Sequence, residues 1–259
     1  EFLAMKEFCG NKIGERRSEF DGYLTSGGFP KALEFPDPDA KVKYVNDIVE
    51  QIFEKDIRKR CKIKNRVVFD KVMTYLVNNF GSRINLQSLE NYFRSALQTP
   101  IKKETLKRYL DILQVFRVLY KCSRFDMKSR KSLLGKSKYY LADTGIYFAR
   151  NVDGRINYGP MLENIVYTYL SSRGYSMSVG QIGRLECDFI ARKRNEYFYI
   201  QVSMTIADRN TEDREYRALS AARDHYPRYL FTLDTLLQKR DGVKHVNLID
   251  FIAERRDLV

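Results

Sequence analysis

The last third of the chain alternates apolar strands with amphipathic helices, and this order limits its possible folds more than any other feature. From residue 151 to 259 the sequence predicts a helix, three strands, a second helix, a strand, and a final strand and helix. The strand segments include "YSMSVGQ", "RLECDFIARK", "EYFYIQVSMT" and "RYLFTLD". Helices interleaved with strands in this way pack on both faces of a mixed sheet. We therefore expect an α/β domain with a mixed sheet at residues 151–259.

The residues before this domain are mainly helical. Residues 1–64 are expected to form a helical segment, in which the apolar residues of "KVKYVNDIVEQIFEKDIRKR" recur every three or four positions. In residues 65–150, three amphipathic helices precede two β-rich runs. This is the order of a winged-helix domain, a variant of the helix-turn-helix arrangement. The whole sequence therefore predicts an α+β protein, with a helical segment, a winged-helix-like domain and an α/β domain in that order.

Basic residues outnumber acidic ones. The chain has 46 Lys and Arg against 33 Asp and Glu, a net charge of +13 and a pI near 9.5. Such a charge favours a polyanionic partner, here double-stranded DNA, although solvated lysines on a protein-docking domain would give the same composition. In a helix-turn-helix domain the recognition helix enters the major groove, and the wing contacts phosphates. The candidate nucleic-acid-binding residues on that helix and wing are Lys102, Lys103, Lys107, Arg108, Lys128, Arg130 and Lys131. Tyr197 and Tyr199 are interpreted as strand-packing residues rather than as base-stacking residues.

Cysteines and apolar segments indicate the compartment. The four cysteines, Cys9, Cys61, Cys122 and Cys187, form no CxxC pair and have no neighbouring histidine. Neither a zinc site nor a disulfide framework is therefore predicted, and we expect a reduced, cytoplasmic protein. No apolar run approaches the ~20 residues that span a bilayer, so no membrane partner is expected. The chain starts at "EFLAMKEF" without an initiator methionine, which we interpret as the start of a fragment of a longer protein.

Acidic and polar residues gather in the stretch "LECDFIARKRNEYFYIQVS". Glu186 and Asp188 are two residues apart on a predicted strand and therefore share a face. Gln201 and Ser203 share a face of the next strand, which a short turn makes its neighbour, and Glu163 in the preceding helix is expected to point to the same place. Converging carboxylates are ligands for Mg²⁺ or Mn²⁺, and such an ion can activate a water at a phosphodiester. The alternative is that these residues form only the solvent-exposed face of a strand pair.

Several longer segments carry a resemblance to a known family. They are "YLTSGGFPKAL", "YVNDIVEQIFEKDIRKR", "KYYLADTGI", "LENIVYTYLSSRGYSMSVG", "ECDFIAR", "YFYIQVS" and "EDREYRALSAARDHYPRYLFTLD". Over nearly its whole length the chain resembles the uncharacterised C-terminal domain that follows an AAA+ ATPase module in many prokaryotic predicted ATPases. The resemblance implies a winged helix and a restriction-endonuclease-like domain of the PD-(D/E)xK nuclease fold. It also implies a catalytic site at Glu163, Asp188, Gln201 and Ser203. From the converging carboxylates, the metal ligands, if any, are expected to be Glu163, Glu186 and Asp188.

Two positions depart from the pattern of that nuclease superfamily, which has Glu-x-Lys where this chain has Gln201 and Ser203. Glutamine offers an oxygen but no charge to a divalent metal ion. Serine is neutral at pH 7 and cannot stabilise negative charge as a lysine does. Compensation would require Glu186 as a second carboxylate, or a lysine such as Lys193 that reaches in from elsewhere. We therefore expect a catalytically silent or very weak site, for which Mg²⁺ or Mn²⁺ is the only cofactor that the residues suggest.

The nucleotide-binding motif of an ATPase does not occur in the sequence. There is no GxxxxGK[ST], and "TSGGFPK" has the wrong spacing and is interpreted as a structural turn. ATP is thus expected only for a separate N-terminal module, which would be a partner of this chain. The leading hypothesis is a nucleic-acid-binding C-terminal part of an AAA+ protein with a silent nuclease-like domain. The alternatives are a weak Mn²⁺- or Mg²⁺-dependent DNA nuclease and a protein-interaction scaffold of a signalling-type ATPase.

Overall fold

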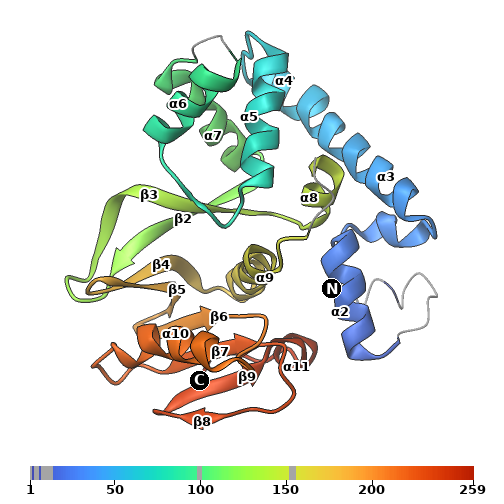
Figure 1. The fold of residues 1–259 in the computed structure, drawn as a ribbon. Coiled ribbons are helices and arrows are strands. Elements are labelled where there is room, and N and C mark those ends of the chain that lie inside the picture. Colours follow the sequence, from blue (N-terminus) through green and yellow to red (C-terminus); the bar gives the residue numbers. More distant parts are fainter. Residues whose placement is uncertain (1, 3–5, 7–13, 98–100, 152–155) are drawn as a thin grey trace. The chain divides into compact units, whose positions relative to one another are not determined.

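The computed structural model describes residues 2, 6, 14–97, 101–151 and 156–259 (Figure 1). It is a mixed α/β protein with a helical N-terminal part followed by a sheet domain, as the sequence predicts. Two compact units are present: the first comprises residues 1–121 and 139–156, and the second comprises residues 122–138 and 157–259. The chain passes from one unit to the other within strands β2 (Leu119–Asp126) and β3 (Lys131–Leu141). None of the described helices combines the length and apolar character that a bilayer-spanning helix requires.

The first unit is built mainly of helices. Its described elements are α2 (Arg16–Ser26), the 3-10 helix η1 (Pro30–Glu34), α3 (Pro38–Gln51), the π-helix η2 (Ile52–Ile57), α4 (Arg58–Arg60), α5 (Arg66–Asn78), β1 (Arg83–Ile84), α6 (Leu86–Leu97), α7 (Lys103–Val115) and α8 (Gly145–Arg150). Helix starts follow local capping chemistry, because the side chains of Asp37 and Asn65 accept hydrogen bonds from the first turns of α3 and α5. The predicted apolar stripe runs from α3 into η2, where Val45, Val49 and Phe53 are buried.

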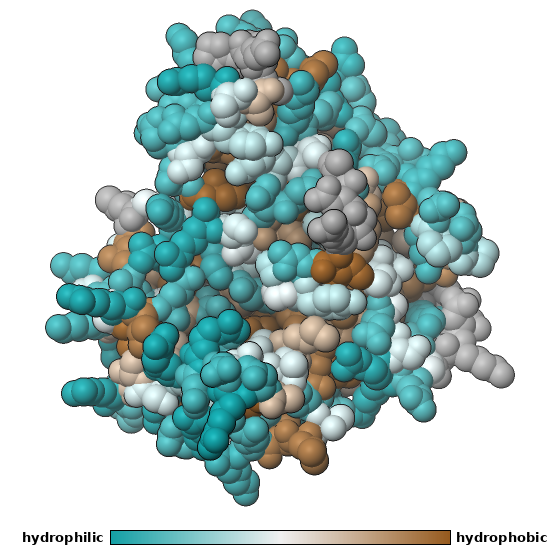
Figure 2. Space-filling view, viewed as in Figure 1, coloured by the Kyte–Doolittle hydropathy of each residue, from teal (hydrophilic) through white to brown (hydrophobic). Residues whose placement is uncertain are grey.

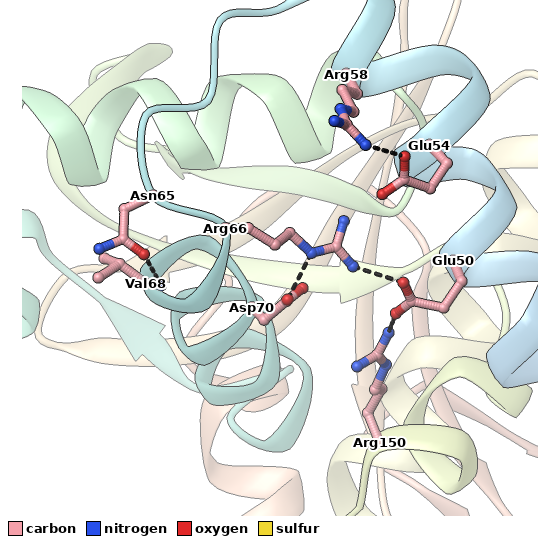
Figure 3. Close-up of polar contacts among 8 residues, drawn as sticks. All are labelled: Glu50, Glu54, Arg58, Asn65, Arg66, Val68, Asp70 and Arg150. Atoms are coloured by element: carbon pink, nitrogen blue, oxygen red, sulfur yellow. Dashed lines mark hydrogen bonds and ion pairs between the residues drawn. The ribbon is translucent and has the colours of Figure 1, made fainter.

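An arginine network ties three helices of the first unit together (Figure 3). The Arg66 guanidinium lies 3.2 Å from the centroid of the Phe53 ring. Its Nε donates to Asp70 at 2.6 Å, and its Nη2 donates to Glu50 at 2.7 Å. Glu50 also accepts a hydrogen bond from Arg150 at 2.6 Å. Glu50 on α3 therefore connects α5 with α8, and the charges of Arg66 and Arg150 are paired with carboxylates of the same unit.

The "TSGGFPK" segment is a turn held by a half-buried aspartate, Asp143. Gly27 ends α2 with a φ of 74°, and a Cβ at this position would lie 2.2 Å from Oδ1 of Asp143. The two carboxylate oxygens of Asp143 accept hydrogen bonds from the backbone N–H groups of Gly28 and Gly145 at 2.9 and 2.7 Å. Glycine is required at position 27 because only it combines a positive φ with this close approach. The interpretation of this segment as a structural turn is confirmed.

The second unit contains a mixed sheet. Its strands follow the order β2-β4-β5-β6-β7-β9-β8, with β3 on the outer side of β2. The pairs β2–β4, β6–β7 and β7–β9 are parallel, and β4–β5, β5–β6 and β8–β9 are antiparallel. The other elements of this unit are α9 (Tyr158–Ser172), β4 (Ser176–Ile182), β5 (Leu185–Lys193), β6 (Glu196–Val202), α10 (Arg209–Ser220), β7 (Arg228–Thr232), β8 (Lys239–Arg240), β9 (Val243–Asn247) and α11 (Leu248–Ala253).

Helices cover both faces of this sheet, as expected (Figure 1). On one face, Tyr216 and Leu219 of α10 belong to the same core as Ile190 of β5 and Tyr199 of β6. On the other face, Tyr167 of α9 lies against Phe189, at 6.2 Å between ring centroids, and Phe251 of α11 lies against Phe231, at 4.9 Å. Adjacent residues of one strand point to opposite faces, so these contacts assign α10 to one face and α9 and α11 to the other.

A register shift interrupts the alternation of β5. Cys187 pairs with Gly180 and Ile190 pairs with Ser178, so that Asp188 and Phe189 lie opposite Val179 alone. Two residues against one is a β-bulge, which bends a strand and redirects its side chains. As a result Cys187 and Ile190, which strict alternation would place on opposite faces, share one core. The bulge thus includes Asp188, one of the acidic residues that the sequence proposes for the site.

Candidate functional site

The predicted polar residues line one cleft of the second unit, about 540 Å³ in volume. Glu163 comes from α9, Glu186 and Asp188 from β5, and Gln201 and Ser203 from β6 and the residue that follows it. The structure therefore brings together all the residues that the sequence proposed for the catalytic and metal sites. It adds two that the sequence did not propose, Glu215 of α10 and Lys138 of β3.

A chain of hydrogen bonds fixes Asp188 and Gln201. The backbone N–H of Asp188 donates to Oε1 of Gln201 at 2.9 Å, and Oδ2 of Asp188 accepts from the backbone N–H of Val202 at 2.9 Å. The other end of the Gln201 amide donates to Oε2 of Glu215 at 2.8 Å. An amide can accept at one atom and donate at the other, whereas a carboxylate can only accept. Glutamine at this position therefore serves as a neutral link between β5 and α10.

Lys138 supplies positive charge to the cleft. Its Nζ lies 2.8 Å from Oε2 of Glu163 and 3.8 Å from Oε1 of Glu186. Burial acts to lower the pKa of Lys138, but the charges of Glu163 and Asp188 outweigh burial and raise it. The ammonium group is thus protonated at neutral pH, and it lies between two carboxylates that a metal ion would otherwise be expected to bind.

Asp188 is a strongly perturbed acid of the cleft. Removal from water, followed by the charge of Glu163, raises the pKa of Asp188 to about 8, although Lys138 and the N–H of Val202 act in the opposite direction. The folded protein therefore disfavours the ionised form of this side chain. A strongly shifted acid in a cleft is a common property of functional sites and also of structural carboxyl clusters.

Glu215 is held by a charged neighbour at the mouth of the cleft. Its Oε1 accepts hydrogen bonds from Nε and Nη2 of Arg214 at 3.0 and 2.7 Å. Glu215 is buried, whereas the Arg214 side chain is 66% exposed. Hydrophilic residues cover much of the face of the molecule drawn in Figure 2. The cations that pair with carboxylates of the cleft, Lys138 and Arg214, thus come from β3 and α10, outside the predicted motif.

The chemical capacity of the cleft is limited. Among the described residues no group of three or more His, Cys, Asp or Glu side chains is arranged to hold a metal ion. The ligands suggested by the sequence, Glu163, Glu186 and Asp188, share the cleft, but Lys138 is bound to the first two, and the raised pKa of Asp188 disfavours its ionised form. Hard cations require ionised oxygen ligands, so the arrangement does not fit a resident Mg²⁺ or Mn²⁺ ion.

Ser203 and Lys193 do not supply the missing lysine function. The hydroxyl of Ser203 donates to the carbonyl oxygen of Thr205 at 3.1 Å. Lys193 is bound elsewhere, with its Nζ 3.6 Å from Asp257 and 4.6 Å from the centroid of the Tyr175 ring. Lys193 therefore does not provide the compensating lysine, and Lys138 is a lysine that reaches the site. Its one local signal is its position directly before the apolar run of "KYYLAD", where a lysine needs a buried acidic partner.

The predicted basic residues are exposed, and they belong to different units. Lys102, Lys103, Lys107 and Arg108 lie on or next to α7 in the first unit, where Arg108 hydrogen-bonds the carbonyl oxygen of Lys62. The turn between β2 and β3 carries Lys128 and Arg130, and Lys131 is the first residue of β3; all three are exposed in the second unit. Arg130 is partly used within the protein, since its guanidinium lies 4.7 Å from the centroid of the Tyr197 ring.

The fold and the cleft define a mixed α/β protein with an acidic cluster beside a helix-covered sheet. A family model, the domain of unknown function DUF8612, matches residues 17–154, just over half of the chain, and the chain belongs to this family. It is 30% identical over 260 residues to an uncharacterized protein of Haemophilus influenzae. It is 25% identical over 232 residues to the uncharacterized protein MJ1544 of Methanocaldococcus jannaschii.

These alignments cover most of this chain and a smaller part of each relative. They include 97% and 86% of this chain, but 63% of the Haemophilus protein and 51% of the Methanocaldococcus protein. The chain thus spans between half and two thirds of the length of the curated relatives that it matches. No solved structure matches the chain.

Proposed function

We propose that the chain is a nucleic-acid-binding C-terminal part of an AAA+ ATPase-family protein. Support comes from its net charge of +13 and from the exposure of the seven candidate cations. The order of α5, α6, α7, β2 and β3 is also that of a winged helix. Relatives that extend well beyond the aligned region leave room for a separate ATPase module. In this proposal double-stranded DNA binds to the basic surfaces, and the ATPase module is the protein partner.

The second unit is, in this proposal, a nuclease-like domain whose cleft does not cut. The observation that carries this view is the contact of Lys138 with Glu163 at 2.8 Å, because a bound ammonium group neutralises a carboxylate that a divalent ion would need. The use of Gln201 as a link to Glu215 points the same way, since its amide already bonds at both ends within the protein. The cleft then stabilises the domain, and binding takes place on the basic surfaces.

Removing lysines from α7 is expected to weaken DNA binding and its salt dependence. The triple variant Lys102→Gln, Lys103→Gln, Lys107→Gln should reduce the slope of log K against log salt by about 0.9 for each phosphate that the variant no longer neutralises. The measurement is fluorescence anisotropy of a labelled DNA duplex over a salt series. All three side chains are exposed, so the fold is expected to tolerate the changes.

A matched variant separates this effect from that of net charge. Lys31→Gln, Lys43→Gln, Lys59→Gln removes three exposed lysines of the same unit and lowers the net charge equally. It should leave the slope close to that of the wild type. Equal slopes for the two triple variants would exclude α7 as the DNA-binding helix. If the wild type bound no duplex at low salt, the proposal that it binds double-stranded DNA would fail. If it bound no single strand either, the scaffold alternative would replace the nucleic-acid proposal.

A weak metal-dependent nuclease is the second candidate. Lys138 brings to the cleft the ammonium group that Ser203 lacks, and Glu215 brings the carboxylate that Gln201 lacks. Incubation with supercoiled plasmid and Mn²⁺, Mg²⁺ or EDTA decides between the two. On the leading proposal the wild type leaves the plasmid intact in all three conditions. Nicking that requires Mn²⁺ or Mg²⁺ and disappears in Asp188→Ala would show instead that the cleft is catalytic.

A further inference from the structure

A second, smaller hollow lies on the sheet of the second unit, about 100 Å³ in volume. It differs from the cleft in chemistry, because its described lining contains aromatic rings, hydroxyls and a guanidinium group and no carboxylate. The lining residues that matter here are Phe125, Ser132, Ser176, Ser178, Arg192 and Tyr197. They come from the β2–β3 hairpin and from β4, β5 and β6, which pair as neighbours in this sheet.

The rings of the hollow continue into a partly exposed aromatic surface. Phe125 and Tyr197 are stacked with 6.0 Å between centroids and 23° between planes. Tyr226 meets Tyr197 edge-on at 5.2 Å, and His225 follows Tyr226 at 4.5 Å. Tyr197 and Tyr226 are only half-buried. Tyr197 thus packs against the core of this unit, as the sequence predicts, and part of its side chain is also exposed.

Two arginines frame the Tyr197 ring. The guanidinium of Arg130 lies 4.7 Å from the centroid of Tyr197 and 5.1 Å from that of Tyr226, and it donates to the hydroxyl of Tyr226 at 3.2 Å. Arg192 is exposed and pairs with Tyr197 across β5 and β6. A hydrogen bond from Arg192, and then one from Arg130, lowers the pKa of Tyr197. The hollow is therefore electropositive beside a stacking surface.

This combination matches one chemical class of ligand. Guanidinium and hydroxyl groups donate hydrogen bonds to phosphate oxygens, and Tyr and Phe rings stack on nucleobases. A volume of about 100 Å³ admits one small group rather than a helix of nucleic acid. Bases of a duplex are covered on both faces by their neighbours, so only an unpaired base can stack on a protein ring. We propose that this hollow binds one nucleotide unit of single-stranded nucleic acid, with its phosphate at Arg192 and the serines. Its base stacks on Tyr197, where it replaces the exposed Arg130 side chain that lies over the ring in this structure.

This inference rests on the proposed function, because it states that the hollow of a nucleic-acid-binding protein binds a single strand. It adds a contact that the seven candidate cations do not describe. Charge alone binds the backbone of any nucleic acid, whereas stacking at Tyr197 requires an unpaired base. The hollow would therefore give the protein a preference for a single strand over a duplex at equal length.

A tryptophan at position 197 provides a direct test. The chain contains no tryptophan, so Tyr197→Trp introduces a single indole reporter. A short oligothymidylate should quench its emission saturably, whereas an abasic oligonucleotide of the same length should bind with little quenching. The control is Tyr44→Trp, on α3 of the first unit, whose emission should not respond. Binding of oligothymidylate, measured by anisotropy, without quenching of the Tyr197→Trp protein would overturn the inference.

Two further variants complete the test. Tyr197→Leu should weaken oligothymidylate binding by about 5- to 150-fold, on the usual 1–3 kcal/mol for a stacked base, and should leave duplex binding nearly unchanged. Arg192→Gln should weaken binding of both oligothymidylate and the abasic strand. If duplex and single strand bind equally and neither variant matters, the stacking site is excluded and the proposed function stands. If the protein binds neither, both proposals fail.

Discussion

Lys138→Met is expected to destabilise the second unit by about 3–5 kcal/mol, the usual effect of removing one partner from a buried ion pair. The Lys138 and Glu163 side chains are only 8% and 15% exposed, and their charged atoms are 2.8 Å apart. Methionine fills a similar volume but leaves Glu163 and Glu186 without the ammonium group that compensates them. The measurement is urea unfolding at pH 7, followed by far-UV circular dichroism.

Lys193 supplies the matched control for this prediction. Its ammonium group lies 3.6 Å from Asp257, and both side chains are more than a third exposed. Exposed pairs contribute roughly 0–1 kcal/mol, so Lys193→Met should unfold close to the wild-type urea concentration. The double variant Lys138→Met, Glu163→Gln should recover part of the stability, because the carboxylate that needs the lysine is then neutral. Equal destabilisation by the two single lysine variants would show that the cleft pair is no more important than a surface pair.

The carboxyl cluster was predictable from the sequence to the extent that it depends on local strand pairing. Asp188 and Gln201 lie on two strands joined by a short turn, and the register Phe189–Ile200 places them opposite one another. Glu163 could be added only through the family resemblance and through its position among apolar neighbours. All three line the cleft. The β-bulge at Asp188 was not predictable, since nothing in "LECDFIARK" marks the extra residue.

Lys138 and Glu215 were missed for different physical reasons. Lys138 contacts Glu163 on a different element, 25 residues further along the chain, and no local pattern specifies such a contact. Glu215 did have a signal, because Ala218 and Leu219 follow it at three and four residues and place it on the buried face of α10. A glutamate on an apolar face needs a partner, and Gln201 is that partner. Helical periodicity could therefore have linked α10 to the cleft.

The seven cations illustrate the limit of a charge argument. Composition correctly predicts that they are exposed, because isolated Lys and Arg are rarely buried. It does not predict that Arg130 stacks on Tyr197, or that Arg66 and Arg150 are used by Glu50 within the first unit. Net charge thus overstates the number of cations available to a partner. This is why the DNA proposal is tested with a charge-matched control.

The order of stability of the Asp188→Asn variant and the wild type is expected to depend on pH, with the variant the more stable protein at high pH. The pKa of Asp188 is raised to about 8 from an ordinary value of 3.8, so the folded state holds this proton more tightly than the unfolded state. The resulting stabilisation is complete below about pH 4 and is lost as the pH rises towards 8, where the carboxyl group ionises beside Glu163 and Glu215. Asparagine keeps an oxygen for the N–H of Val202 and cannot ionise. It should therefore be the more stable form at pH 9, by a few kcal/mol on the basis of about 1.4 kcal/mol for each pKa unit.

Asp257 gives the control with the opposite sign. Its hydrogen bond with Arg173 lowers the pKa of Asp257 to about 2, so its charge is favourable in the folded state throughout the range from pH 5 to 9. Asp257→Asn should therefore be less stable than the wild type at both pH values, with no reversal. Urea unfolding of the wild type and the two variants at pH 5 and pH 9 measures the difference. The groups that face Asp188, namely Lys138, Glu163 and Glu215, are unchanged in Asp188→Asn. If the difference in stability between Asp188→Asn and the wild type were the same at pH 5 and pH 9, Asp188 would be ionised at both pH values. The cleft would then hold a carboxylate at neutral pH, and the argument against a bound cation would lose its second support.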